Sequence, residues 1–205
     1  MWSQIRGEMM ETDNIYLIIG PSGSGKTTLT EALAHEHGLM TVWSYTTRPP
    51  RFEGEEGHIF VSDEEFDKLG EMCAYTEYNG YRYGVTSEII DQSNLYVIDP
   101  PGVQYMFEHY HGKKGIVTIF LDIDAHYRGT RMLKRGDSWN KMEERLKLDA
   151  EWFDPDKFSF TLDCTIHDKM TQMDQKEAPP KAIQQAVWDY ICMRECISTL
   201  EDSAK

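Results

Sequence analysis

The sequence has few cysteines, few basic residues and no long apolar run, and each shortage excludes a class of protein. Four cysteines in 205 residues are too few for a disulfide scaffold, so we expect reduced thiols. The 21 Lys and Arg against 35 Asp and Glu give a net charge of −14, which excludes a general nucleic-acid binder and disfavours an anionic membrane surface. The longest apolar runs, at 15–19 and 116–121, have the length of strands rather than of a membrane span. The first 13 residues contain acids where a signal peptide would be apolar. We therefore expect a cytoplasmic protein with no nucleic-acid or membrane partner.

What the chain does have is an alternation of strand-length apolar runs with segments of helical period. We expect strands over 15–20, 41–47, 95–99, 116–123 and 158–164. Helices are expected over 26–37, from 62 to 70, over 102–111, 124–135 and 139–153, and after 180. Runs that are apolar throughout are typical of strands covered on both faces. The pattern predicts an α/β domain whose five-stranded parallel core sheet is flanked by helices.

The segment 48–94 departs from this alternation. It has little helical pattern and many Gly, Tyr and charged residues, which indicates a lobe inserted into the core. The core then consists of 14–47 and 95–205, after an N-terminal extension over 1–13. We expect the C-terminal helix to pack on the core sheet, and the protein to be a monomer or a homodimer.

One segment carries a specific chemical signal. Residues 20–27 read G-P-S-G-S-G-K-T and fit the pattern G-x-x-x-x-G-K-T of a phosphate-binding loop, the P-loop. Its glycines let the backbone curl so that several N–H groups point at phosphate oxygens, and the following helix directs its N-terminus at the anion. Lys26 is expected to reach the β- and γ-phosphates, and the Thr27 hydroxyl to bind Mg²⁺. The predicted nucleotide-binding residues are Gly20, Pro21, Ser22, Gly23, Ser24, Gly25, Lys26, Thr27 and Thr28.

Several downstream segments resemble guanylate kinases. Residues 45–51 read Y-T-T-R-P-P-R and continue into Gly54-Glu55, which is similar to the family's T-T-R-x-P-R-x-G-E segment. Tyr83-Gly84 matches part of its G-N-Y-Y-G turn, and residues 97–103 resemble its D-I-D-x-Q-G-V strand end. Residues 131–138 with Arg145 are similar to its lid arginines. The resemblance runs in order from about residue 15 to 165.

This resemblance implies a P-loop kinase fold in which the loop binds ATP, the inserted lobe binds a nucleoside monophosphate, and a short helical lid over about 126–148 closes on the phosphates. It implies that Arg48 and Arg51 grip the acceptor phosphate with Tyr83 as a partner. It places Asp99 near the acceptor base and the water shell of Mg²⁺. Arg135 and Arg145 are implied to reach the ATP phosphates from the lid, beside Arg131.

These cations suit phosphoryl transfer on physical grounds as well. The reaction spreads charge over the oxygens of the moving group, so catalysis consists of positioning and cations. The acceptor oxygen of a monophosphate is already ionised, so no strong general base is needed. We therefore expect ATP-dependent transfer to a nucleoside monophosphate, with Mg²⁺ as cofactor and the following catalytic residues: Lys26, Arg48, Arg135 and Arg145.

The match fails where the acceptor base should bind. The family's guanine-binding Glu aligns with Ala74, and its Ser or Thr after Tyr-Gly aligns with Val85, although Glu77 and Thr86 lie nearby. Losing two hydrogen-bonding groups would erase most selectivity for guanine. Either Glu77 and Thr86 take over and the acceptor is GMP or dGMP, or the pocket receives another (deoxy)nucleoside monophosphate or a ribose phosphate. A third alternative is a non-catalytic guanylate kinase-like binding module, against which the complete P-loop argues.

Overall fold

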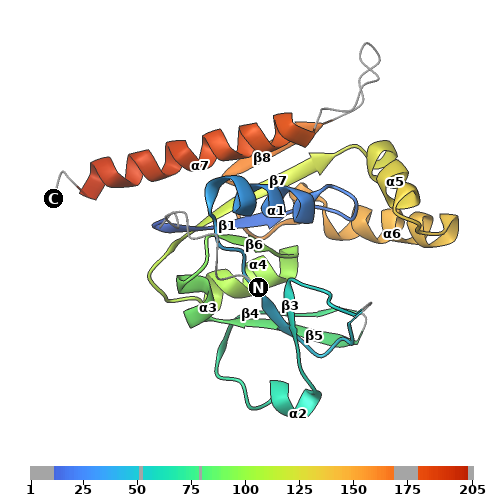
Figure 1. Cartoon of the computed structure of the whole chain (residues 1–205), viewed down its shortest axis with the longest axis horizontal. Coiled ribbons are helices and arrows are strands. Elements are labelled where there is room, and N and C mark those ends of the chain that lie inside the picture. Colours follow the sequence, from blue (N-terminus) through green and yellow to red (C-terminus); the bar gives the residue numbers. More distant parts are fainter. Residues whose placement is uncertain (1–11, 51–52, 79, 169–179, 203–205) are drawn as a thin grey trace.

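The core of the molecule is a parallel sheet that carries helices on both faces (Figure 1). The computed structural model describes residues 12–50, 53–78, 80–168 and 180–202. Within these residues, the core strands run parallel in the order β6-β1-β7-β8. Their bounds are Asn14–Ile19 (β1), Leu95–Val97 (β6), Gly115–Ile123 (β7) and Cys164–Asp168 (β8). The predicted α/β class is therefore confirmed.

The structure corrects the predicted number of five core strands to four among the residues that it describes. Thr41 makes a single parallel bridge to Leu95 where a fifth strand would lie, and the chain then leaves the core. The expected strand over 158–164 begins only at its last residue, Cys164, after a short 3₁₀ turn (η1, Pro155–Lys157) and a loop. Phe158 and Phe160 are apolar because this loop packs them against the core, where Phe158 meets the ring of Phe120.

Alternation along β1 divides the core between two helical layers. Tyr16 and Ile18 pack on the face covered by helix α1 (Lys26–His37) and helix α7 (Pro180–Asp202). Ile15 and Leu17 pack on the opposite face, which is covered by helix α4 (Pro100–His109). The expectation that the C-terminal helix packs on the sheet is confirmed. Helices α5 (Ala125–Lys134) and α6 (Trp139–Trp152) form a hairpin at one end of the molecule (Figure 1).

A second sheet lies beyond α4, with strand order β3-β2-β5-β4 (Figure 1). Its strands are Ser44–Thr46 (β2), His58–Phe60 (β3), Met72–Tyr78 (β4) and Tyr81–Thr86 (β5). Two short helices accompany it: α2 (Asp63–Phe66), which begins with a capping box between Ser62 and Glu65, and α3 (Ser87–Asp91). We call this sheet with α2 and α3 the lobe. Strand β2 falls inside the predicted strand 41–47 but pairs with lobe strands.

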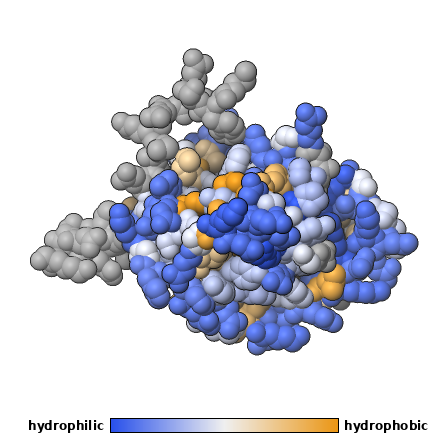
Figure 2. All heavy atoms as spheres, turned by 90° about the horizontal axis from the view of Figure 1, so that it is seen from below, coloured by the Kyte–Doolittle hydropathy of each residue, from blue (hydrophilic) through white to orange (hydrophobic). Residues whose placement is uncertain are grey.

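The surface seen from below the view of Figure 1 is mostly hydrophilic, as the charged composition leads one to expect (Figure 2). None of the helices in the described part of the chain is long and apolar enough to cross a membrane.

Candidate functional site

The P-loop connects the carboxyl end of β1 to the first turn of α1, as its pattern predicts. Gly25 caps α1 with a left-handed φ of 93°, and Gly23 has a φ of 77°. A Cβ atom on Gly23 would lie 2.7 Å from the carbonyl oxygen of Arg128 in α5. Glycine is therefore required at this position by both the backbone conformation and the close approach of α5.

Lys26 points back into this loop. Its Nζ donates to the carbonyl oxygens of Gly20, at 2.6 Å, and Pro21, at 3.0 Å. Burial lowers the pKa of Lys26 to about 8, and the nearby arginines Arg128 and Arg135 act in the same direction. The charges of Asp149 and Asp99 oppose this shift. The loop thus encloses a cation whose hydration is already reduced.

The neighbouring loop residues present polar groups to the same space. Thr27 and Thr28 are exposed on the first turn of α1. Ser24 is buried, and its hydroxyl makes no hydrogen bond among the residues that the structure describes. A buried donor of this kind is normally satisfied by a ligand or by water.

Two charged residues that the sequence patterns did not single out hold the first half of the loop. Asp149 of α6 accepts hydrogen bonds from the Ser22 backbone N–H (2.8 Å) and from Arg128 Nη1 of α5 (3.1 Å). The same arginine donates to the Ser22 carbonyl at 3.3 Å. Both charged side chains are buried. Helical periodicity could not find them, because charged residues within a helix usually face solvent.

The predicted lid arginines occupy two places. Arg131 Nη1 donates to the Gly23 carbonyl at 3.0 Å, so this side chain lies against the P-loop. Arg135 and Arg145 both pair with Asp137 in the turn between α5 and α6, at 2.5 and 3.5 Å. Arg135 is also near enough to lower the pKa of Lys26. The structure therefore brings Arg131 and Arg135 towards the loop and keeps Arg145 beside Arg135.

On the lobe side, Arg48 is buried and firmly held. Its guanidinium forms a bidentate pair with Glu55, at 2.8 and 3.2 Å, and lies over the ring of Phe60. The hydrogen bonds and the charge of Glu55, with a smaller effect of the nearby Tyr83, raise the pKa of Arg48, so it remains charged. Its Nε is buried without a hydrogen-bond partner among the described residues. The other predicted acceptor arginine, Arg51, lies outside the described residues.

The pairing of β4 with β5 decides which residues lie on the same face of this hairpin as Tyr83, the neighbour of Arg48. Thr76 pairs with Tyr83, and Ala74 with Val85, so strand alternation puts these four on one face. Thr76 is near enough to the Asp99 carboxylate to lower its pKa, which indicates that this face is turned towards the core.

The opposite face of the hairpin carries Glu77. It pairs with Arg82, whose guanidinium lies over the ring of Phe66 and binds Asp63 and Asp67. Glu77 is exposed and accepts a hydrogen bond from Tyr75. The structure therefore does not bring Glu77 together with Tyr83 and Asp99, although the sequence predicted a shared site.

Asp99 links the two sides. It caps α4, and its Oδ1 accepts from the Gly102 N–H at 2.8 Å. Burial raises its pKa, while Gly102, Thr76 and the charge of Lys26 act against that shift. Asp99 is thus close enough to both Thr76 of the lobe and Lys26 of the loop to interact with each. The loop and the lobe therefore open on one site.

The donors available for Mg²⁺ are the Thr27 hydroxyl and the Asp99 carboxylate. Among the described residues, no group of three or more His, Cys, Asp or Glu could hold a metal ion. A hydroxyl and a carboxylate are hard oxygen donors, and Mg²⁺ is commonly bound by one or two such groups together with substrate phosphates. The residues present fit that mode of binding.

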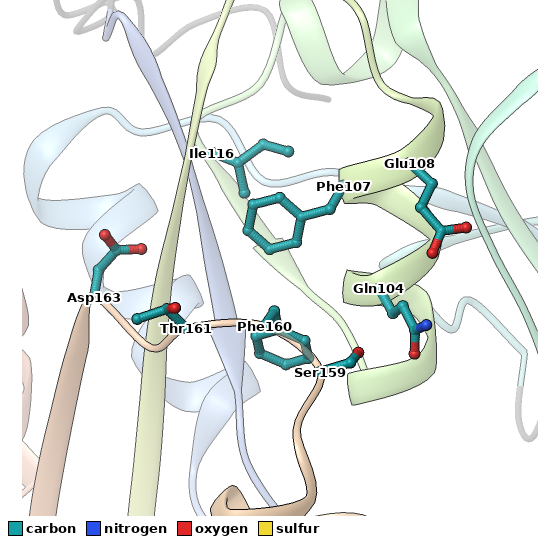
Figure 3. A pocket seen from close by; sticks show the side chains of 8 residues that line it. All are labelled: Gln104, Phe107, Glu108, Ile116, Ser159, Phe160, Thr161 and Asp163. Carbon is teal, nitrogen blue, oxygen red and sulfur yellow. The ribbon is translucent and has the colours of Figure 1, made fainter.

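A separate pocket of about 500 Å³ lies between α4, β7 and the loop before β8 (Figure 3). Phe107, Ile116 and Phe160 line it. Ile116 is paired with Ile15 at the start of β1, whereas the P-loop follows the end of that strand. The pocket therefore lies at the amino ends of the core strands, whereas the P-loop lies at their carboxyl ends.

Comparisons with known proteins agree with this geometry. The guanylate kinase family model matches residues 12–98. The chain is 35% identical to a guanylate kinase from a Polaromonas species over 155 residues, covering 67% of this chain and 65% of that protein. It is 32% identical to the Nitrosomonas europaea guanylate kinase over 143 residues, covering 64% and 70%. It is also 27% identical to a ribose 1,5-bisphosphate phosphokinase from Thiobacillus denitrificans over 161 residues, covering 72% and 82%.

A guanylate kinase structure from Anaplasma phagocytophilum shares the fold, with a TM-score of 0.57 and 22% identity over 91% of this chain and 88% of that one. Of the Polaromonas guanylate kinase, the aligned part of this chain spans 65% of the length, slightly less than two thirds.

Proposed function

The chain belongs to the guanylate kinase family, and we propose that it transfers the γ-phosphoryl group of ATP to a nucleoside monophosphate, giving ADP and the nucleoside diphosphate. One observation carries the proposal. Two buried donors, the Ser24 hydroxyl of the loop and Arg48 Nε of the lobe, have no partner among the described residues. They belong to the two sides that Asp99 joins. A phosphate on each side would satisfy both.

The loop side supplies the donor site. Lys26 would move from the carbonyls of Gly20 and Pro21 onto the β- and γ-phosphates, and the backbone N–H groups would bind the oxygens between them. Thr27 would hold Mg²⁺ directly and Asp99 through water. Held there, Mg²⁺ would supply positive charge that neutralises the charge developing on the phosphate oxygens.

The lobe side supplies the acceptor site. Arg48, fixed by Glu55, is pre-organised to hold the acceptor phosphate, with Tyr83 beside it. Arg51 is proposed to share that phosphate. The acceptor oxygen is already anionic, so the protein has to hold it in line rather than remove a proton.

The remaining cations are the three lid arginines, which would bind the phosphates of ATP and the group being transferred. We assign Arg135 and Arg145 to the transition state and Arg131 to the ATP phosphates beside the loop. Asp137 now holds Arg135 and Arg145 together, so both would change partner when substrates bind. A single such donor typically contributes about 100- to 1,000-fold in rate.

The acceptor we propose is GMP or dGMP, in line with the names of the guanylate kinase relatives. A second candidate is a ribose phosphate, as in the name of the Thiobacillus relative. It is favoured by the pairing of Ala74 with Val85, both buried and apolar, on the face that carries Tyr83. Neither side chain can hydrogen-bond the edge of a base.

The test is ADP release from ATP and Mg²⁺ with each common ribo- and deoxynucleoside monophosphate and with ribose phosphates. The proposal predicts turnover with at least one nucleoside monophosphate, GMP or dGMP foremost. Turnover with ribose phosphates alone would select the second candidate. ATP binding without turnover on any acceptor would contradict both and leave the non-catalytic module.

A further inference from the structure

Two oppositely charged side chains lie buried between the α5–α6 hairpin and the P-loop. Arg128 is 7% exposed and Asp149 is 8% exposed, and their nearest charged atoms are 3.1 Å apart. Arg128 Nε is also bound to the Ile123 carbonyl at 3.1 Å. Removing two charges from water is costly, so such a pair needs hydrogen bonds that satisfy its remaining groups. Several of those bonds go to the P-loop.

The pair binds both backbone polar groups of Ser22, whose hydroxyl also donates to Asp149 at 3.3 Å. The N–H of Ser22 donates to Asp149 at 2.8 Å, and its carbonyl accepts from Arg128 at 3.3 Å. The next carbonyl, of Gly23, accepts from Arg131 at 3.0 Å. Two consecutive residues of the loop are thus oriented by side chains of α5 and α6.

The second half of the loop is held differently. The Gly25 carbonyl accepts the first hydrogen bond of α1 from Leu29, so the helix itself fixes this end. Ser22 and Gly23 precede the helix and form the middle of a turn that the Ser24 N–H closes onto the Pro21 carbonyl at 3.2 Å. The polar groups of Ser22 itself are bound from distant parts of the chain, at separations of 127 residues to Asp149 and 106 to Arg128.

We propose that Arg128 and Asp149 are positioning residues that hold Ser22, and through it the adjoining Gly23, in the phosphate-binding shape and thereby set the affinity for ATP. This rests on the proposed function only in taking ATP as the ligand. Neither residue needs to touch the nucleotide. Pre-organised N–H groups bind an anion without first reorganising, so a loop that loses its support binds ATP more weakly.

The decisive comparison is between two double variants, R128M/D149M and R128M/D149N. Both remove the ion pair, so neither leaves an uncompensated buried charge. Only R128M/D149N keeps an oxygen that can accept the Ser22 N–H. Equilibrium binding of ATP with Mg²⁺, measured by calorimetry without acceptor, then reports the state of the loop, and the thermal unfolding midpoint reports folding.

We expect R128M/D149M to raise the Kd for ATP about tenfold or more, the usual effect of losing a hydrogen bond to a charged group. R128M/D149N is expected to recover most of that loss at a similar unfolding midpoint. The matched control is E143Q/K147Q, which removes an exposed ion pair of α6 that lies outside the contacts to the loop and is expected to bind ATP like wild type.

An unchanged Kd in R128M/D149M, or equal weakening in both double variants, would overturn the proposal. A lowered Kd would overturn it too, by showing that the carboxylate competes with phosphate for Ser22. If R128M/D149M fails to fold, R128M/D149N decides alone, because a Kd raised as much as tenfold despite the retained acceptor would refute the role of that bond. Absence of ATP binding by wild type would instead refute the proposed function.

Discussion

Raising the pH above 8 is expected to weaken the binding of ATP, because Lys26 loses its charge in that range. Burial lowers the pKa of Lys26 from its ordinary 10.5 to about 8. If only the charged form binds phosphate tightly, the apparent Kd grows in proportion to 1 + 10^(pH − pKa). It should then be about twofold above its low-pH limit at pH 8 and about tenfold above it at pH 9. A phosphate monoester has its second pKa at about 6, so the phosphates of ATP hardly titrate between pH 8 and 9.

The assay is calorimetric titration with ATP and Mg²⁺ at half-unit steps from pH 7 to 9.5. The control is Lys26→Met, which should bind weakly and show no comparable rise. A flat profile for wild type over this range would refute the argument, since it would mean that Lys26 keeps its charge in the free protein or is not needed for binding. The same shift acts on folding with the opposite sign. Between about pH 8 and 10.5 the folded chain holds fewer protons on Lys26 than the unfolded chain, so this residue's contribution to stability rises with pH there.

Three substitutions test other parts of the site. Glu55→Gln removes the charged partner of Arg48. In steady-state kinetics it is expected to raise the KM for the acceptor about tenfold and to leave the KM for ATP unchanged. Equal changes in both KM values would contradict the separation of the donor and acceptor sides. Arg135→Ala is expected to lower kcat about 100- to 1,000-fold with little change in ATP binding, as measured by single-turnover kinetics, and a loss of less than threefold would exclude a role in the transition state. Gly23→Ala puts a Cβ atom on a residue of left-handed backbone conformation, 2.7 Å from the Arg128 carbonyl oxygen. It is expected to lower the free energy of unfolding, measured in urea, by at least about 1–2 kcal/mol and to weaken ATP binding. Wild-type values for both quantities would show that the loop and α5 are not packed as described.

The parts of the site that local patterns encode could be predicted from the sequence. The P-loop was predicted because glycine spacing, the lysine and the flanking elements all lie within a few residues of one another. The resemblance to guanylate kinases implied a site role for Asp99, and the structure puts this residue near both Lys26 and Thr76. The first strand and the first helix followed from periodicity and from Gly38, which ends α1 with a left-handed φ of 69°.

What could not be predicted depends on contacts between distant segments. Apolar residues at 158–160 pack on the core from a loop, and composition alone does not distinguish such a loop from a strand. The face on which Glu77 lies follows from its pairing with Arg82, and this register depends on where the chain turns between β4 and β5, which the resemblance did not fix. The pairing of Asp149 with Ser22 joins residues 127 positions apart. Helical periodicity identifies the face of a helix that is apolar, and it gives no sign of a charge buried against another segment.

The central claim is that this site moves a phosphoryl group from ATP to a monophosphate. The most direct test is to incubate the protein with γ-labelled ATP, Mg²⁺ and GMP or dGMP, and to identify the labelled products, with Lys26→Met as the control. The account predicts that wild type places the label on the corresponding nucleoside diphosphate and that the variant does not. Label that stays on ATP or is released as inorganic phosphate, with each nucleoside monophosphate supplied, would contradict it.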